Sequence, residues 1–505
     1  MVLNVKAVIS TLGTLLFFLG IALLIPMVVG LYYGEASWWS FGLSALLSMA
    51  LGGGAWYGFG GPRHPYDLRV REGFAIVALA WLVLSLMGGL PFVLGGVLGS
   101  YTDAFFETMS GFTTTGATIL GGAHTPAIED LPKAFLFWRS LAHWLGGMGI
   151  IVLTLAILPI LGVGGMQLFK AEVPGPSADK LTPRVRETAQ RLWYIYVGIT
   201  VVEVVMLSPA MSFFDAVNHA FATMATGGFS TKNGSVADYN SAYVDWVITL
   251  FMYLAGVNFA LHYRLLRGQV VTVVKDTEFK VYTAIVLGAT LIISLAMWEP
   301  LVAALPRAEH VEAAFTGYTS FIEALRYGAF QAVAIITTTG FGTADYEIWP
   351  PLALGVLFLL FFVGGMAGST GGGVKVIRHV LVFKNSFKEI RQLIHPRAVM
   401  PVRLNGTVVP RDVMRNVLSF IVLYIASVTF GTAVMALLGY DLLSAVGVSI
   451  SSVGNIGPAF GMFGPTENYA HLPDIGKWIM SILMMAGRLE IFTVLILFMP
   501  SFWRR

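Results

Sequence analysis

Four short glycine-centred segments, each following a hydrophobic stretch, are the parts of this chain best suited to chemistry. They are Thr113–Ala117, Ala225–Ser230, Thr337–Gly342 and Asn455–Pro458. Their central glycines lie 111, 113 and 117 residues apart, and a near-constant period indicates four copies of one unit. Extended segments of this kind can turn backbone carbonyl oxygens toward a common axis, where rings of carbonyls replace the water shell of a monovalent cation such as potassium.

We therefore predict an ion-binding filter in which glycine supplies backbone conformations that a β-carbon disfavours. Threonine hydroxyls add oxygens or brace the segments. The predicted potassium-binding residues are Thr114, Thr115, Gly116, Thr226, Gly227, Thr338, Thr339, Gly340, Asn455, Ile456 and Gly457. No segment reads Thr-Val-Gly-Tyr-Gly, and the fourth has Asn455 and Pro458. A filter with fewer fixed carbonyl rings should discriminate potassium from sodium less sharply.

A second feature is the run of six glycines in the eleven residues 363–373, within a predicted spanning helix. Each glycine costs about 1 kcal/mol of helix stability, so we expect a break. We call residues 364–373 the glycine loop, and we predict that it gates the ion path below the filter. The alternative is a phosphate-binding loop, because Lys375 follows, but the segment does not match the Walker pattern. The predicted gate residues are Gly364, Gly365, Gly368, Ser369, Thr370, Gly371, Gly372, Gly373 and Arg488.

Arg488 is a charged residue within the last predicted span. Charges inside a membrane are costly and face a cavity or a partner. We interpret Arg488 as a pore-facing barrier or a latch to the glycine loop. The alternative is a local pair with Glu490, although residues two apart lie on different helix faces.

The remaining polar groups carry weaker signals. His143, His219 and His262 have no metal-ligand spacing, so structural hydrogen bonding is the expected role. Glu203 lies within a predicted span, either as a buried partner or as an ion-coupling group. The chain shows no clustered catalytic residues and no Rossmann glycine motif, which argues against a membrane-embedded enzyme. We predict no cofactor and no nucleic-acid partner.

The elements that must position these residues are membrane helices. Ten stretches approach the roughly 20 apolar residues that a span needs; they are 5–33, 38–58, 73–98, 134–162, 187–209, 243–268, 279–305, 352–382, 410–438 and 475–499. The last eight form four pairs, and each pair brackets a segment too short to cross the hydrocarbon. These short segments are 102–114, 213–225, 322–338 and 441–453. Each unit is therefore predicted as helix, half-helix, extended turn and helix.

Composition and charge agree with a multi-pass membrane protein. The 505 residues are 56% hydrophobic and 12% charged and contain no cysteine, whereas soluble proteins are about 25% charged. Of the 31 Lys and Arg, 24 fall into six clusters. The positive-inside rule makes these clusters, and so both termini, cytoplasmic. The largest cluster has nine Lys and Arg between Lys375 and Arg415.

With these motifs in place, the chain resembles the Trk/Ktr/HKT superfamily of cation transporters, in its TrkH-like branch of potassium-uptake subunits. The resemblance covers the four turns, the glycine loop, Trp144–Gly149, Gly487–Glu490 and the stretch Leu393–Val399 with Leu404–Gly406. It implies a homodimer in the bacterial cytoplasmic membrane with one pore per subunit. It also implies a cytosolic, nucleotide-binding regulatory partner of the TrkA kind. Sodium-permeable relatives carry Ser at the first-repeat glycine, where this chain has Gly116.

We thus expect an all-α polytopic membrane protein that takes up potassium through a carbonyl-lined filter. Ion-coupled symport with protons or sodium is the main alternative, and a sodium-permeable member of the superfamily is another. The predicted parts are an N-terminal helix pair and four pore repeats; they span residues 1–60, 61–163, 164–270, 271–400 (with the glycine loop) and 401–505.

Overall fold

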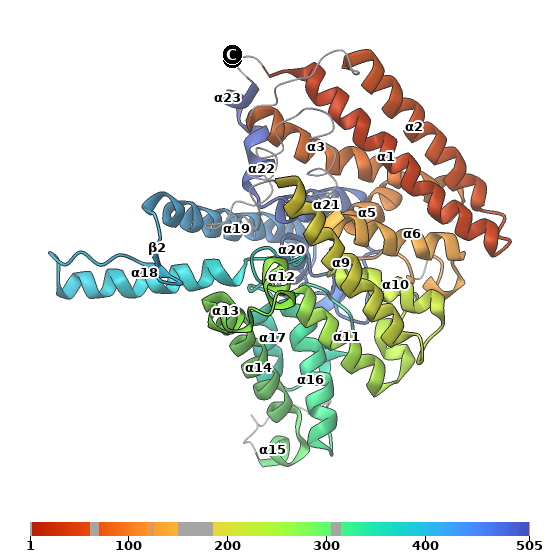
Figure 1. Ribbon diagram of the computed structural model, residues 1–505. Helices are drawn as coiled ribbons and strands as arrows, with labels where there is room; N and C mark the ends of the chain where they lie inside the picture. The colour runs from red at the N-terminus through yellow and green to blue at the C-terminus, as the bar shows by residue number, and fades with distance from the viewer. Residues whose placement is uncertain (1–2, 61–69, 123–124, 150–184, 305–314, 504–505) are drawn as a thin grey trace.

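The computed structural model describes residues 3–60, 70–122, 125–149, 185–304 and 315–503, which form a helical bundle with one small hairpin (Figure 1). The longer helices are α1 Val5–Tyr32, α2 Trp38–Phe59, α3 Val70–Gly88, α6 Lys133–Trp144, α9 Val185–Leu207, α11 Ala242–Ala255, α14 Thr277–Met297, α17 Pro351–Leu360, α18 Val376–Ile394, α19 Arg411–Leu437 and α21 Asp474–Arg488. Short helices are α4 Leu90–Leu94, α12 Phe259–Leu266, α13 Val270–Lys275, α15 Glu299–Ala304, α22 Phe492–Leu495 and α23 Pro500–Trp503.

The N-terminal pair α1 and α2 packs side by side along one edge of the bundle (Figure 1). The two backbones touch where glycines face each other. A β-carbon added to Gly52 would lie 2.5 Å from the carbonyl oxygen of Gly13. Small residues permit this close approach of two apolar helices, which the lipid alone does not drive together.

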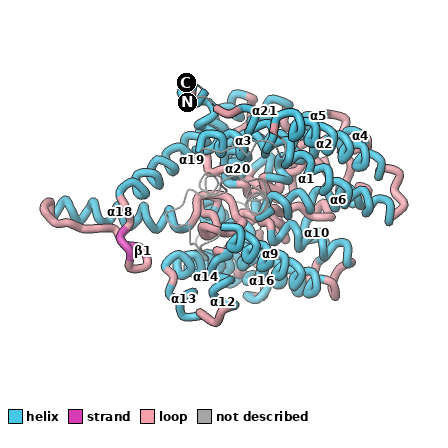
Figure 2. The backbone as a smooth tube through the Cα atoms, turned by 45° about the horizontal axis from the view of Figure 1, so that its top comes forward, coloured by secondary structure: helices cyan, strands magenta, loops and turns pink. Residues whose placement is uncertain are grey.

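The four predicted short helices are present, and their lengths are 12, 12, 16 and 13 residues. They are α5 Tyr101–Phe112, α10 Phe213–Met224, α16 Phe321–Ile336 and α20 Leu442–Gly454. Two begin with side-chain caps, because Ser212 and Asp441 accept hydrogen bonds from backbone N–H groups three residues later. Each of the four ends where its glycine segment starts. Figure 2 shows loop segments gathered in the middle of the bundle and surrounded by helices.

The ten predicted spans are not all continuous helices. Among the described residues, five helical stretches are long and apolar enough to cross a membrane, and two bent pairs raise this to seven. The pair α11 and α12 bends by 100°, and α21 with the helical segment Phe492–Phe498 bends by 117°. The predicted span 134–162 passes from α6 into a π-helix at Leu145–Gly149, and the rest of it lies outside the described residues.

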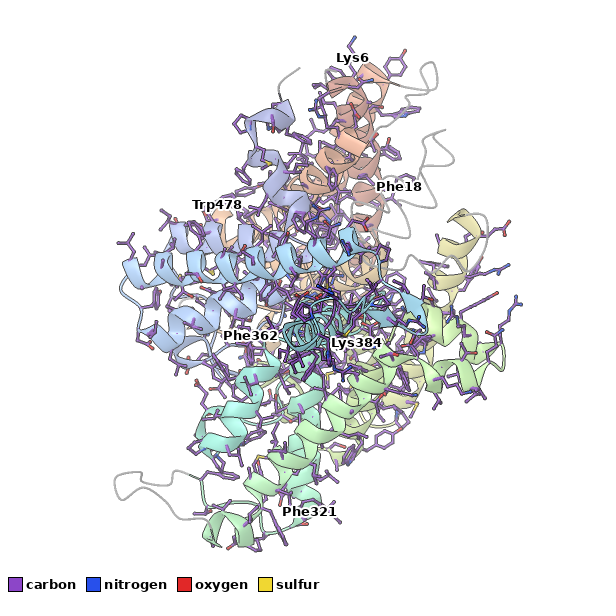
Figure 3. All side chains as sticks on the ribbon, turned by 90° about the vertical axis from the view of Figure 1, so that its left-hand side faces the viewer. Lys6, Phe18, Phe321, Phe362, Lys384 and Trp478 are labelled. Atoms are coloured by element: carbon purple, nitrogen blue, oxygen red, sulfur yellow. The ribbon has the colours of Figure 1, made fainter. Side chains whose placement is uncertain are left out.

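The predicted break in span 352–382 is confirmed. Helix α17 ends at Leu360, and α18 begins only at Val376. Helix α18 then extends beyond the bundle with α19 beside it (Figure 1), and Figure 3 views this side and labels Lys384 on α18. The antiparallel hairpin of β1 Arg403–Leu404 and β2 Thr407–Val408 is tied to it, because Lys384 Nζ donates to the Arg403 carbonyl at 2.8 Å.

Candidate functional site

The four glycine segments share one backbone signature. The residue directly after each short helix, or one further on, has a left-handed conformation, with φ of 51°, 55°, 60° and 56° at Thr114, Thr226, Thr338 and Asn455. Two residues later a glycine has φ of 80°, 79°, 74° and 101°. We call these the ring glycines; they are Gly116, Gly228, Gly340 and Gly457. All the predicted filter threonines and Asn455 are buried.

The ring glycines correct the register predicted for the second segment. Gly228, and not Gly227, has the positive φ that matches the other three segments, and the spacings become 112, 112 and 117 residues. Gly227 instead corresponds to the residue before each ring glycine. Two adjacent glycines satisfy a sequence pattern equally well, so only the backbone conformation separates them.

The four ring glycines form a closed cycle of backbone contacts. A β-carbon added to one ring glycine would clash with a carbonyl oxygen of the next segment, namely that of the residue before its ring glycine. The added carbon of Gly116 would lie 2.1 Å from the Gly227 oxygen, and that of Gly228 would lie 2.0 Å from the Thr339 oxygen. The added carbon of Gly340 would lie 1.9 Å from the Ile456 oxygen, and that of Gly457 would lie 2.6 Å from the Thr115 oxygen, which closes the cycle. No side chain fits at a ring position without moving a backbone. The four segments therefore surround one axis with their backbones in direct contact.

Hydroxyl groups brace the ring from outside. Thr115 Oγ1 lies 2.8 Å from Thr113 Oγ1, and Thr339 makes the same contact with Thr337 at 2.8 Å. Asn455 Nδ2 donates to Thr115 Oγ1 at 3.1 Å, which joins the fourth segment to the first.

The fourth segment differs from the others in its hydrogen bonds as well as in its sequence. The carbonyl of Gly457 accepts hydrogen bonds from Ser451 Oγ at 2.9 Å and from Tyr469 OH at 2.5 Å. This oxygen is already engaged by the protein, so it is a poorer candidate for an ion.

The glycine loop lies directly beneath the ends of the third and fourth short helices. The N–H of Gly372 donates to Thr338 Oγ1 at 2.6 Å, and a β-carbon on Gly372 would lie 2.5 Å from the Gly454 carbonyl oxygen. A β-carbon on Gly371 would lie 3.0 Å from the Thr337 carbonyl oxygen. Glycine at these positions thus allows the loop to press against the backbone under the ring.

The loop also contacts the second unit and closes on itself. Thr370 Oγ1 donates to the Ala255 carbonyl at 3.2 Å, and Gly368, with φ of 76°, accepts from the N–H of Phe259 at 3.0 Å. Ser369 Oγ donates to the Met366 carbonyl at 2.6 Å. At the neck of the loop, Gly364 N–H donates to Val374 at 2.9 Å and Val376 N–H donates to Gly365 at 3.2 Å. Gly373, with φ of 64°, turns the chain into this neck.

Arg488 connects the loop to the first unit. Its guanidinium donates to the Thr370 carbonyl at 2.6 Å and to the carbonyls of Gly146 and Gly147 at 2.7 and 2.9 Å. These contacts are compatible with the predicted latch to the glycine loop, and Glu490 forms an ion pair with Arg378. Glu490 lies in the sharp bend after α21, where it and Ile491 have φ of 61° and 56°.

Glu278 is a residue of the site that the sequence prediction missed. This buried carboxylate, in the first turn of α14, accepts the N–H of Ala367 at 2.8 Å and of Ile377 at 3.0 Å, both on Oε1. It therefore holds the loop and the start of α18 together. The hairpin caps the same helix end, because Asn405 Oδ1 accepts from Thr277 N–H at 2.9 Å. A lone acidic residue at the start of a span has no sequence signal beyond ordinary capping.

The histidines have the structural hydrogen bonds that were predicted. His143, His219 and His262 each contact a backbone carbonyl, at 2.9, 2.8 and 2.9 Å. In the part of the chain that the structure describes, no three His, Cys, Asp or Glu side chains could share a metal ion. Glu203 is fully buried; neither of its oxygens makes a hydrogen bond of good geometry with the described residues, and the Thr223 hydroxyl lies beside it.

The loop that follows the third glycine segment carries acidic groups. Glu347 accepts the N–H of Gly461 at 2.5 Å, which ties the third segment's loop to the fourth's. Burial raises the pKa of the Glu347 carboxyl; the Gly461 N–H opposes this rise, and the neighbouring Asp345 and Glu467 add to it.

The fold and the site define a polytopic helical membrane protein in which four glycine turns surround one axis above an intramembrane loop. The profile of the TrkH family, described as cation transport proteins, matches residues 41–505, and the chain belongs to this family. The predictions of a transporter rather than an enzyme, and of the Trk-type family, are confirmed.

Relatives match over the full length. The Trk system potassium uptake protein TrkH of Halomonas elongata is 38% identical over 507 residues, covering 100% of both chains. The TrkH of Escherichia coli K12 is 38% identical, covering 99% of this chain and 100% of its own. The crystal structure of the potassium transporter TrkH from Vibrio parahaemolyticus aligns with a TM-score of 0.84 at 36% identity, covering 99% of each chain.

Proposed function

We propose that this protein takes up potassium ions across the bacterial cytoplasmic membrane through the ring of glycine segments. The observation that carries the proposal is the closed cycle in which each ring glycine lies against a carbonyl of the next segment. Such a cycle concentrates backbone oxygens around one axis, and carbonyl rings can replace the hydration shell of a monovalent cation. The similarity to potassium uptake proteins along the whole chain supports the same substrate.

In this proposal the filter consists of the predicted residues in the corrected register. The segments Thr114–Gly116, Thr226–Gly228, Thr338–Gly340 and Asn455–Gly457 supply the oxygens. Their buried short helices end at the segments, and the negative end of a helix dipole favours a cation there. Potassium is the substrate and not a resident cofactor.

The glycine loop is the gate of this pathway. It lies against the third and fourth segments through Gly372, against the second unit through Thr370, and against the first unit through Arg488. Because it contacts three units directly and is linked to the first unit through Arg488, its displacement would open the path beneath the ring. The hydrogen bonds of Arg488 and Glu278 would then hold it closed.

We further propose that the protein is a homodimer in the inner membrane, has both termini in the cytoplasm, and binds a TrkA-like nucleotide-binding regulatory subunit. The cytoplasmic assignment follows from the six basic clusters; the 163–190 connector of one cluster lies largely outside the described residues. Helix α18 and the hairpin extend from the glycine loop to the outside of the bundle (Figure 1). They therefore offer a direct route from a cytosolic partner to the gate.

One observation favours a second candidate, which is symport with protons. The buried Glu203 carboxyl makes no hydrogen bond of good geometry with the described residues, and only the Thr223 hydroxyl is shown beside it. Burying a carboxyl inside a span is costly, and proton relays in transporters use intramembrane acids of this kind.

Rubidium uptake into proteoliposomes, with sodium and proton gradients varied separately, tests these proposals. We expect rubidium to move down its own gradient when no other gradient is present. Uptake that requires an imposed proton gradient would establish symport instead. Uptake of sodium at the same rate as rubidium would place the protein among sodium-permeable relatives.

A further inference from the structure

The second filter segment differs from the other three at the residue before its ring glycine. Three segments carry a side chain there, namely Thr115, Thr339 and Ile456, whereas the second carries Gly227. The two threonines fold back against their own short helices through hydroxyl contacts of 2.8 Å. Gly227 cannot brace itself in this way, although its carbonyl oxygen faces Gly116 in the same cycle.

The ring of His143 occupies the space that a side chain at position 227 would need. A β-carbon added to Gly227 would lie 2.3 Å from His143 Nδ1, 2.4 Å from Cγ and 2.7 Å from Cε1. These include the atom nearest the His143 backbone, so the ring cannot swing aside without a new rotamer. His143 is fully buried on α6, a helix of the first unit.

His143 is itself fixed on two other sides. Nδ1 lies 2.9 Å from the Gly111 carbonyl in the short helix α5, which makes Nδ1 the protonated nitrogen because a carbonyl only accepts. The imidazole also lies against the ring of Phe229, with centroids 4.1 Å apart. His143 therefore joins the end of the first short helix to the second filter segment.

Arg139, one helical turn before His143, fixes the same segment further along. Its guanidinium lies 4.1 Å from the centre of the Phe229 ring and donates to the Ser230 carbonyl at 3.1 Å. It also forms a buried ion pair with Glu107 on α5 at 2.8 Å. Positions 227, 229 and 230 of the second segment are thus all held by α6.

We propose that His143 is a positioning residue for ion selectivity: its ring replaces the missing side chain of the second filter segment and sets the position of the Gly227 carbonyl. This inference rests on the proposed filter. It predicts that His143 and Gly227 are a matched pair, so that a change at one can be compensated only at the other.

The test is a swap measured as the ratio of rubidium to sodium uptake in proteoliposomes. Gly227→Thr alone places a side chain in the His143 ring, and His143→Ala alone leaves Gly227 without support. Each should lower the ratio about tenfold, which corresponds to about 1.4 kcal/mol of difference between the two ions. The double variant His143→Ala/Gly227→Thr should return the ratio to within about threefold of the wild type, because the threonine side chain can then occupy the space that the His143 ring leaves.

Two further variants separate positioning from general stability. His143→Asn keeps a planar group and a donor where Cγ and Nδ1 lie, so it should keep the wild-type ratio. His262→Ala removes another buried histidine with a carbonyl contact of 2.9 Å, to Leu254, and should not change ion preference even if it lowers the yield of folded protein.

The proposal is overturned if His143→Ala keeps the wild-type ratio in folded protein, or if the double variant is no better than Gly227→Thr. Should Gly227→Thr fail to fold, His143→Ala and His143→Asn still decide the matter. Failure of the filter itself looks different, because Gly116→Ser would then also leave the ratio unchanged. A changed ratio in Gly116→Ser with no change in His143→Ala refutes the role of His143 alone.

Discussion

At the scale of single residues, the ring glycines carry the strongest constraint in the molecule. Gly116 has φ of 80°, and an added β-carbon would lie 2.1 Å from the Gly227 carbonyl oxygen. Left-handed backbone costs an ordinary residue about 1–2 kcal/mol, and the clash adds to this. A substitution at Gly116 therefore displaces the Gly227 carbonyl oxygen, which is part of the proposed filter.

We predict that Gly116→Ser lowers the ratio of rubidium to sodium uptake while the protein still inserts in the membrane. The displaced Gly227 carbonyl widens the ring on one side, and a wider ring fits potassium less selectively. Flux of both ions in proteoliposomes measures the effect. Gly198→Ala is the control, since nothing lies within 4 Å of a β-carbon there. An unchanged ratio in Gly116→Ser would remove the first segment from the filter.

The same scale shows the limit of prediction from sequence. Glycine-centred turns at a near-constant period identified all four segments, but the Gly227–Gly228 pair left the register open by one residue. Glu278 was missed because its partners are backbone N–H groups of Ala367 and Ile377, about a hundred positions away. Backbone donors are present at nearly every residue, so composition contains no record of such a contact.

At the scale of elements, the short helices and the broken span follow from local rules, whereas the bends do not. Short apolar runs ending in glycine predicted α5, α10, α16 and α20, and the glycine run predicted the break between α17 and α18. The bend of 117° after α21 contains Glu490 and Ile491, which both have a positive φ. A β-branched residue is disfavoured there, so only tertiary contacts such as the Arg378–Glu490 ion pair explain it.

We predict that Arg488→Ala raises rubidium flux without changing the ratio of rubidium to sodium. The variant loses three hydrogen bonds that connect the loop to the first unit. A hydrogen bond to a charged group contributes about 1.5 kcal/mol or more, and loss of one shifts a closed–open equilibrium by about tenfold. Removing Gly368 to Gly372 should act in the same direction. Wild-type or lower flux in both variants, with normal insertion, would make the loop a structural bend and not a gate.

Glu278 supplies a second test of the loop with a built-in control. Glu278→Ala leaves the N–H groups of Ala367 and Ile377 without their acceptor, at a cost of about 1–3 kcal/mol for each buried group, so we expect higher flux. Both groups bind the same oxygen, Oε1. Glu278→Gln keeps that oxygen and should therefore keep wild-type flux. If Gln and Ala behave alike, the negative charge, and not the shared hydrogen bond, holds the loop.

At the scale of the whole molecule, the basic clusters predicted a cytoplasmic face, but the structure divides the largest cluster into different roles. Lys375 and Arg378 are buried, at 9% and 4% exposure, beside the glycine loop. Lys384 is bonded to the hairpin through the Arg403 carbonyl. A count of charges along the sequence cannot separate these internal groups from those that are available to a partner.

Lys388 and Arg391 remain the best candidates for docking the proposed cytosolic subunit. Both belong to the C-terminal half of α18, the helix that projects from the bundle (Figure 1), and Lys388 forms an ion pair with the adjacent, exposed Glu389 at 3.1 Å. We predict that reversing both charges, Lys388→Glu with Arg391→Glu, weakens co-purification of a nucleotide-binding partner by about tenfold at low salt and less at high salt. Charges at the rim of an interface act mainly through steering that salt screens.

Lys384→Glu is a poor substitute in this experiment, because it also breaks the link between α18 and the hairpin, and through Asn405 it would disturb α14 and the gate. Rubidium flux without the partner distinguishes the two effects. The Lys388 and Arg391 variant should keep wild-type basal flux, whereas Lys384→Glu should change it. Lys232→Glu, on the opposite predicted face, is the matched control and should bind the partner normally. Equal co-purification of the Lys388 and Arg391 variant and the wild type at both salt concentrations would move the docking surface away from α18.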